Sequence, residues 1–213
     1  MQNIAIKMGL SRAGLAETVN LSYAGNLSKY MKIVLVRHGR PERAENIVVD
    51  SVGFAKWVRA YDKSLVSSES RPSQVLRDKF KDFYIVSSDL PRAIHSSSIA
   101  LNLKPHHQSR LLREMDIPRY KLPFTFKAFT WVYINRLLWM LGKKGPFESY
   151  AEARARAKKA AHELVQTAKV EGKVIVFAHG YLNLHMRKYL RKSGFVQRST
   201  SNGYWGISEF EAK

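Results

Sequence analysis

Short apolar runs alternate with longer amphipathic stretches along most of the chain. The runs at residues 32–36, 84–86 and 174–177 predict strands, and residues 204–207 predict a weaker fourth strand. Short strands without polar alternation are typical of a sheet that helices cover on both faces. We therefore predict an α/β fold, a three-layer αβα sandwich around a mainly parallel central sheet.

The stretches between the runs have helical spacing. Residues 54–61, 149–169 and 182–190 each predict a helix. A further helix is expected to end near residue 101 and to begin at Ser88 and Asp89, which form a plausible N-cap region with a proline in the first turn.

Residues 122–141 do not fit this alternation. The segment is rich in Phe, Trp and Leu and is nearly long enough to span a bilayer, but Lys127, Asn135 and Arg136 interrupt it. We predict a buried or lid-like helix within an insertion of about residues 117–147. An interfacial helix on an anionic membrane is the alternative.

Composition narrows the function through charge. The 213 residues include 36 Lys and Arg against 17 Asp and Glu, which gives a net charge of +19, and there is no cysteine. The charge attracts anions, so phosphates, nucleic acid and anionic lipid are all candidate partners. The lack of cysteine excludes disulfides, a thiolate nucleophile and zinc-cysteine sites.

No secretory signal is evident, because residues 1–30 lack a continuous apolar core. Met31 directly precedes the first predicted strand. We therefore expect one domain over residues 31–213, with residues 1–30 as a peripheral extension, and a cytoplasmic location. A targeting function for the extension is the alternative.

Two of the predicted strands end in a histidine followed by a glycine. The first leads into His38 and Gly39, and the third leads into His179 and Gly180. The ligand crevice of an open α/β sheet lies beyond the carboxyl ends of its strands, and glycine lets the backbone approach a ligand closely. We expect both imidazoles to project into one crevice.

Two arginines belong to the same predicted edge. Arg37 precedes His38, and Arg92 lies one helical turn beyond Ser88 at the end of the second strand. Guanidinium groups match phosphate oxygens bidentately, and a neutral imidazole is a competent nucleophile near pH 7 because its pKa is about 6.5. These groups suit a tetrahedral dianion, although residue chemistry alone leaves open which histidine attacks.

A leaving alkoxide also needs a proton. Glu114 is the best-placed carboxylic acid, because it follows a segment around residues 106–108 that we expect to form the next strand.

Five motifs follow one another along the chain: Arg37-His38-Gly39, Ser88 with Arg92, Glu114, Glu148-Ser149 and Ala178-His179-Gly180. Taken in this order, they resemble the motifs of the histidine phosphatase superfamily, also called phosphoglycerate-mutase-like, over roughly residues 31–210. The resemblance implies that His38 becomes phosphorylated and that Arg37, Arg92 and His179 bind the phosphoryl group. It implies that Glu114 protonates the leaving group and later activates water. We also place Gly39 and Ser88 among the phosphate-binding residues, although Ser88 is equally plausible as a helix N-cap alone.

The chain departs from the mutase pattern. Arg40-Pro41-Glu42 follows the first motif, Ala44 stands where the family has an asparagine, and an aromatic insertion replaces the mutase lid. These departures favour a metal-independent phosphomonoester hydrolase without a cofactor, with a phosphoglycerate-mutase-type phosphotransferase as the alternative. The other histidines show no metal-ligand spacing.

The net charge keeps a non-catalytic basic module open, one that binds anionic membrane or nucleic acid. The sequence contains no motif of a known nucleic-acid module, so we expect no specific nucleic-acid partner. The expected partner is a phosphorylated protein, sugar, nucleotide or lipid, and membrane association is the minor alternative. Aromatic residues of the insertion are expected either to line the substrate site or to pack the lid; they are Phe124, Phe126, Phe129, Trp131, Tyr133 and Trp139.

Overall fold

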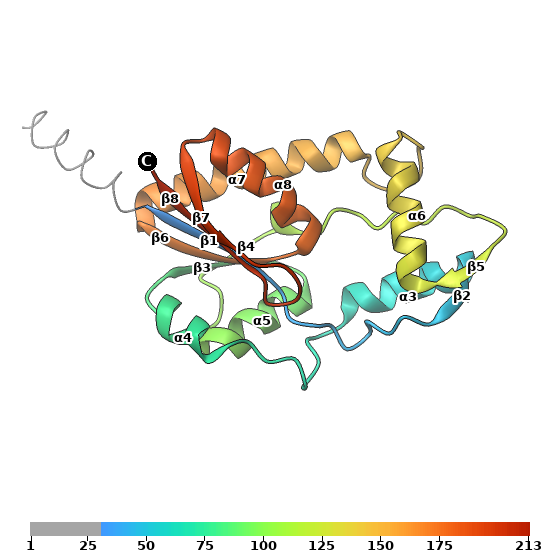
Figure 1. The fold of residues 1–213 in the computed structure, drawn as a ribbon, viewed down its shortest axis with the longest axis horizontal. Coiled ribbons are helices and arrows are strands. Elements are labelled where there is room, and N and C mark those ends of the chain that lie inside the picture. The colour runs from blue at the N-terminus through green and yellow to red at the C-terminus, as the bar shows by residue number, and fades with distance from the viewer. Residues whose placement is uncertain (1–30) are drawn as a thin grey trace, which may run out of the picture.

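The computed structural model describes residues 31–213, and the expectations for residues 1–30 lie outside this range. Six strands form one sheet in the order β4-β3-β6-β1-β8-β7 (Figure 1). The parallel strands are β1 (Lys32–Arg37), β3 (Tyr84–Ser88), β4 (His107–Ser109) and β6 (Lys173–Ala178). The strands β7 (Phe195–Thr200) and β8 (Ile207–Ala212) complete the sheet in antiparallel pairing.

Helices cover both faces of the sheet (Figure 1). One face carries α7 (Tyr150–Glu171) and α8 (Gly180–Lys192), and the other carries α4 (Gln74–Phe80) and α5 (Pro91–Leu101). Alternate residues of β1 reach the two cores: Ile33 and Leu35 pack under α7 and α8, and Val34 packs on the opposite side. This confirms the predicted three-layer sandwich with a mainly parallel sheet.

The insertion packs with residues 48–63 into one unit beyond the carboxyl ends of the parallel strands, at the right of Figure 1. This insertion unit combines α3 (Ser51–Lys63), α6 (Ala128–Met140) and an antiparallel ribbon of β2 (Val48–Asp50) and β5 (Thr125–Lys127). Its core is aromatic, with the Phe54 and Trp131 rings stacked 5.6 Å apart. The prediction of one helix over residues 122–141 was therefore too long, because residues 125–127 pair with β2.

Two other predicted boundaries were wrong. Tyr204 and Trp205 lie in the turn before β8, where Gly203 and Trp205 both have positive φ angles that end an extended strand. Helix α5 begins at Pro91 after Leu90, and no side chain caps it, so Ser88 is not its N-cap. By contrast, Ser149 caps α7 in a capping box with Glu152.

The aromatic segment of residues 122–141 forms no membrane-spanning helix. No helix within residues 31–213 is both long enough and apolar enough to cross a membrane. The aromatic helix α6 has 13 residues.

Candidate active site

His38 lies at the carboxyl end of β1 and is almost completely buried. Its Nδ1 is 2.7 Å from the carbonyl oxygen of Gly39, and its Nε2 is 3.3 Å from the Nε of Arg92. Because a carbonyl oxygen can only accept a hydrogen bond, Nδ1 carries the proton and Nε2 keeps its lone pair. The Nε2 lone pair accepts a hydrogen bond from the Nε–H of Arg92, and it is the electron pair that a nucleophile requires.

His179 is the N-cap residue of α8, at the carboxyl end of β6. Its ring centroid is 5.0 Å from that of His38, so the paired parallel strands bring the two predicted histidines together. Its Nε2 is 2.9 Å from the hydroxyl of Ser88, and its buried Nδ1 has no partner within residues 31–213. Ser88 therefore orients the second imidazole.

Arg92 is fully buried on the first turn of α5. Its Nη1 donates to the carbonyl oxygens of Tyr61 (3.3 Å) and Asp62 (3.2 Å), and its guanidinium lies 4.9 Å from the centre of the Tyr61 ring. These contacts from α3 fix the guanidinium beside His38. Its Nη2 remains buried without a hydrogen-bond partner in the described structure.

Arg37 approaches the same centre from the end of β1. Its guanidinium lies 4.4 Å from the centre of the Tyr204 ring, and that ring lies 5.9 Å from the His38 ring. The Nε of Arg37 is also buried without a partner inside residues 31–213. Buried polar groups are rarely left unpaired, so unpaired atoms of Arg37, Arg92 and His179 around one imidazole define a cradle for an oxyanion.

Gly39 packs closely against two side chains at the end of β1. Its N–H already donates to the hydroxyl of Ser96 at 2.9 Å. A Cβ at this position would lie 2.5 Å from Trp205 and 2.6 Å from Val66, so the close approach that requires glycine is packing against these side chains.

Glu114 lies beside the first turn of α8. Its Oε1 accepts hydrogen bonds from the backbone N–H groups of Leu182 (2.9 Å) and Met115 (3.0 Å), and Oε2 accepts one from Tyr181 at 3.3 Å. The N-terminus of a helix favours a carboxylate in this position. These amides hold Glu114 at the crevice that also reaches Arg37.

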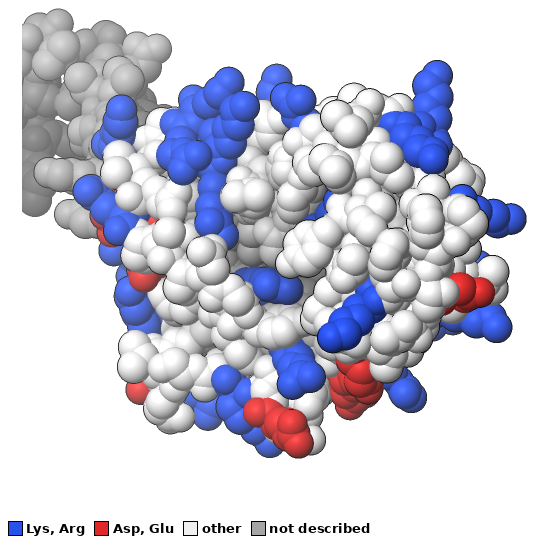
Figure 2. Space-filling view, turned by 45° about the vertical axis from the view of Figure 1, so that its right-hand side comes forward, with Lys and Arg blue, Asp and Glu red and all other residues white. Residues whose placement is uncertain are grey.

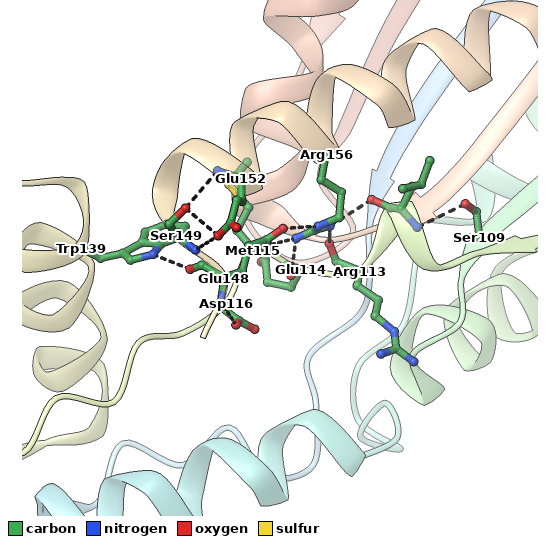
Figure 3. A network of polar contacts seen from close by, with 11 residues as sticks. Ser109, Arg113, Glu114, Met115, Asp116, Trp139, Glu148, Ser149, Glu152 and Arg156 are labelled. Atoms are coloured by element: carbon green, nitrogen blue, oxygen red, sulfur yellow. Dashed lines mark hydrogen bonds and ion pairs between the residues drawn. The ribbon is translucent and has the colours of Figure 1, made fainter. Parts of the chain in front are cut away.

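Arg156 of α7 fixes the backbone around Glu114 (Figure 3). Its guanidinium forms two bonds of 2.6 Å to the carboxylate of Glu148 and also donates to the carbonyl oxygens of Leu111, Arg113 and Glu114. The Glu148-Ser149 motif thus contributes an ion pair to Arg156 and a cap to α7. Neither the position nor the role of Arg156 is evident from its basic stretch of sequence.

The crevice in front of these residues has a volume of about 440 Å³. Figure 2 shows a hollow with Lys or Arg atoms inside it and a broad uncharged surface to its right. Arg37, Tyr61, Glu114 and Tyr204 line the crevice, whereas His38 lies just behind them with 1% of its surface exposed. Ala44 is buried in the insertion core, and Arg40 is exposed outside the crevice lining.

The insertion supplies one wall of the crevice. Of its aromatic residues, Phe129 and Tyr133 line the crevice. Trp131 is fully buried in the core of the insertion unit, and Trp139 is buried in the main core with residues of α7. The insertion therefore contains both crevice-lining and packing aromatic residues. Tyr61 and Tyr204, which also contact the centre, carried no sequence motif that could have identified them.

Burial lowers the pKa of both His38 and His179 well below the ordinary value of 6.5, and the charge of Arg92 lowers it further. The folded protein therefore binds fewer protons than the unfolded chain below pH 6.5. Stability is full above pH 6.5 and falls as the pH drops towards the folded pKa values, by up to about 1.4 kcal/mol per pH unit for each histidine.

This linkage predicts a change in slope for a single substitution. Between pH 6.5 and 5, His179→Gln should reduce the pH dependence of the free energy of unfolding by up to about 1.4 kcal/mol per pH unit, measured by urea denaturation. His162→Gln, on the exposed side of α7, is the control. An unchanged slope in His179→Gln would show that His179 does not contribute this acid sensitivity.

The fold agrees with the comparisons to known proteins. A family model of the histidine phosphatase superfamily (branch 1) matches residues 33–199. The chain belongs to this superfamily, as its motifs predicted, and this membership supports a phosphatase-type enzyme.

Solved structures share the fold at low sequence identity. A functionally characterised open reading frame of Mycobacterium tuberculosis aligns with a TM-score of 0.55 and 15% identity, covering 84% of this chain and 89% of that chain. A phosphoserine phosphatase of Entamoeba histolytica aligns with a TM-score of 0.50 and 18% identity, covering 85% and 97% respectively. No curated protein sequence matches the chain significantly.

Proposed function

We propose that the protein is a phosphomonoester hydrolase that acts through a covalent phosphohistidine at His38. The observation that carries the proposal is the Nε2 lone pair of His38, which lies 3.3 Å from a buried guanidinium that still has an unpartnered nitrogen. A nucleophile beside fixed cationic donors is the arrangement that phosphoryl transfer requires.

In the first step, Nε2 of His38 attacks phosphorus, an N–P bond forms, and the P–O bond to the leaving group breaks. Arg37, Arg92 and His179 stabilise the charge on the phosphoryl oxygens. Glu114 enters this step protonated and gives its proton to the leaving oxygen. It becomes the carboxylate that the N–H groups at the start of α8 stabilise.

In the second step, water attacks the phosphorus of the phosphohistidine. The Glu114 carboxylate takes a proton from this water, the N–P bond breaks, and inorganic phosphate leaves. The cycle returns His38 to its neutral form and Glu114 to its acid form, and it requires only groups that this chain provides.

Two departures from the mutase pattern, at the first motif and in the aromatic insertion, favour hydrolysis over a mutase reaction. Ala44 contributes an apolar side chain to the core of the insertion unit where mutases and many related phosphatases have an asparagine, and Arg40 does not line the crevice. Mutase-type transfer would appear as phosphate moving to a second hydroxyl, whereas hydrolysis releases it to water.

The proposal predicts release of inorganic phosphate from 4-nitrophenyl phosphate in the presence of a metal chelator. Because the nucleophile, the oxyanion donors and the acid are all side chains, chelation should leave the rate unchanged. A colorimetric phosphate assay with and without an added acceptor alcohol distinguishes hydrolysis, which releases phosphate to water, from transfer of the phosphoryl group to the alcohol. Loss of activity with the chelator, or transfer only to the alcohol, would contradict the proposal.

A further inference from the structure

The crevice extends past the catalytic residues to a second group of polar side chains. Arg136 reaches it from α6, and Asn183 and Arg187 reach it from successive turns of α8. Its charged lining consists of Arg37, Arg136, Arg187 and the single carboxylate of Glu114. Three arginines therefore face one carboxylate, and the crevice lining carries an excess of positive charge.

These outer side chains have bonding capacity that the protein does not use. The Nε atoms of Arg136 and Arg187 and the side-chain oxygen of Asn183 are buried, and none has a hydrogen-bond partner in the described part of the chain. Neither arginine forms an ion pair within residues 31–213. Unpaired buried polar atoms from two different elements on one crevice point to a missing ligand.

Neither arginine is neutralised by an acidic side chain within residues 31–213. The guanidinium of Arg136 lies 4.3 Å from the centre of the Tyr181 ring, which gives it a cation–π contact. Burial, and then the charge of Arg191, lowers the pKa of Arg187. A bound anion would offset both the desolvation and this repulsion.

We propose that Arg136 and Arg187 form a second anion site, distinct from the phosphoryl cradle around His38, for a second phosphate or a carboxylate on the same substrate. The inference rests on the proposed function, and it narrows the substrate class to phosphomonoesters that carry a further anionic group. The two guanidiniums bind the anion. The unpaired oxygen of Asn183 is an acceptor, so it takes a hydrogen bond from a hydroxyl or N–H group of the same substrate. The aromatic wall formed by Trp57, Phe129 and Tyr133 contacts the part of the substrate that joins the two groups.

The site can be tested by binding, independently of turnover. Isothermal titration compares three non-hydrolysable ligands: benzylphosphonate, 4-carboxybenzylphosphonate and 1,4-xylylene bisphosphonate. The added anion should tighten binding at least about tenfold, because charge-assisted bonds to guanidinium are strong. A gain with the carboxylate alone, or with the second phosphonate alone, identifies which anion the site takes.

Substitutions separate a built site from the general positive field of the chain. Arg136→Gln and Arg187→Gln should each remove most of the gain from the second anion and leave benzylphosphonate affinity nearly unchanged. Lys188→Gln removes the same charge from the exposed neighbouring position on α8 and should preserve the gain. Equal affinity for all three ligands in the wild type, or an equal loss in the Lys188 control, would overturn the second site.

Turnover distinguishes failure of this inference from failure of the proposed function. If phenyl phosphate is hydrolysed but 4-carboxyphenyl phosphate has no lower KM, the phosphatase assignment stands and the second site is wrong. If the doubly charged ligands bind more tightly but no ester is hydrolysed, the second site stands and the hydrolase assignment is wrong.

Discussion

Replacement of His38 by alanine is expected to reduce phosphate release from 4-nitrophenyl phosphate by about 10⁴-fold or more, since it removes the attacking atom. The fold should survive, because the substitution leaves the sheet pairing of β1 unchanged. Steady-state phosphate release at pH 7, together with circular dichroism of the variant, measures both expectations. His162→Ala is the matched control, because this histidine lies on the exposed side of α7.

The covalent intermediate gives a second readout at the same residue. Wild-type protein quenched in denaturant during turnover should carry one phosphoryl group in a peptide that contains His38, detected by mass spectrometry under alkaline conditions. Label on another residue, or full activity in His38→Ala, would refute the assigned nucleophile.

Replacement of Glu114 by glutamine is expected to slow turnover by about 10²- to 10⁴-fold when the leaving group is an alkoxide, because the amide cannot supply the proton. For 4-nitrophenyl phosphate the loss in the phosphorylation step should be much smaller, since 4-nitrophenolate leaves without protonation. Glutamine retains an oxygen for the N–H groups of Leu182 and Met115, so α8 should stay in place. Rates with glycerol 2-phosphate and 4-nitrophenyl phosphate, measured in single turnovers, provide the comparison.

The leaving-group dependence separates acid catalysis from positioning. A similar loss for both esters would mean that Glu114 acts by holding the start of α8 rather than by donating a proton. Glu171→Gln, at the far end of α7, controls for the change in net charge.

The sheet and the inner part of the site could be predicted because their signals are local. Residues 33–36 and 174–177 are continuous apolar runs that must be buried on both faces, so His38 and His179 had to emerge at the same edge. The order of strands in the sheet then places the two rings 5.0 Å apart.

The parts that the sequence did not predict depend on contacts between distant segments. The pairing of residues 125–127 with residues 48–50 leaves no recognisable strand pattern in the sequence of either short segment. The helix predicted over residues 122–141 was therefore too long. Tyr204 approaches His38 because positive φ angles at Gly203 and Trp205 turn the chain, which its strand-like sequence conceals. The proposed roles of Arg136 and Arg187 follow from single buried unpaired atoms, and the role of Arg156 follows from its contacts with Glu148 and with three carbonyl oxygens. None of these can be identified from the sequence among the many arginines of the chain.

The polar network in Figure 3 links the insertion to Glu114, the proposed acid. Trp139 of α6 donates to the backbone oxygen of Glu148, whose carboxylate holds Arg156, which in turn holds the carbonyl oxygen of Glu114. For the redesign of substrate specificity, this network divides the insertion into two kinds of position. Phe129 and Tyr133 can be substituted to change the crevice wall. Trp139 belongs to the hydrogen-bonded connection to Glu114, so any insertion transplanted from another protein must reproduce this contact to keep Glu114 in place.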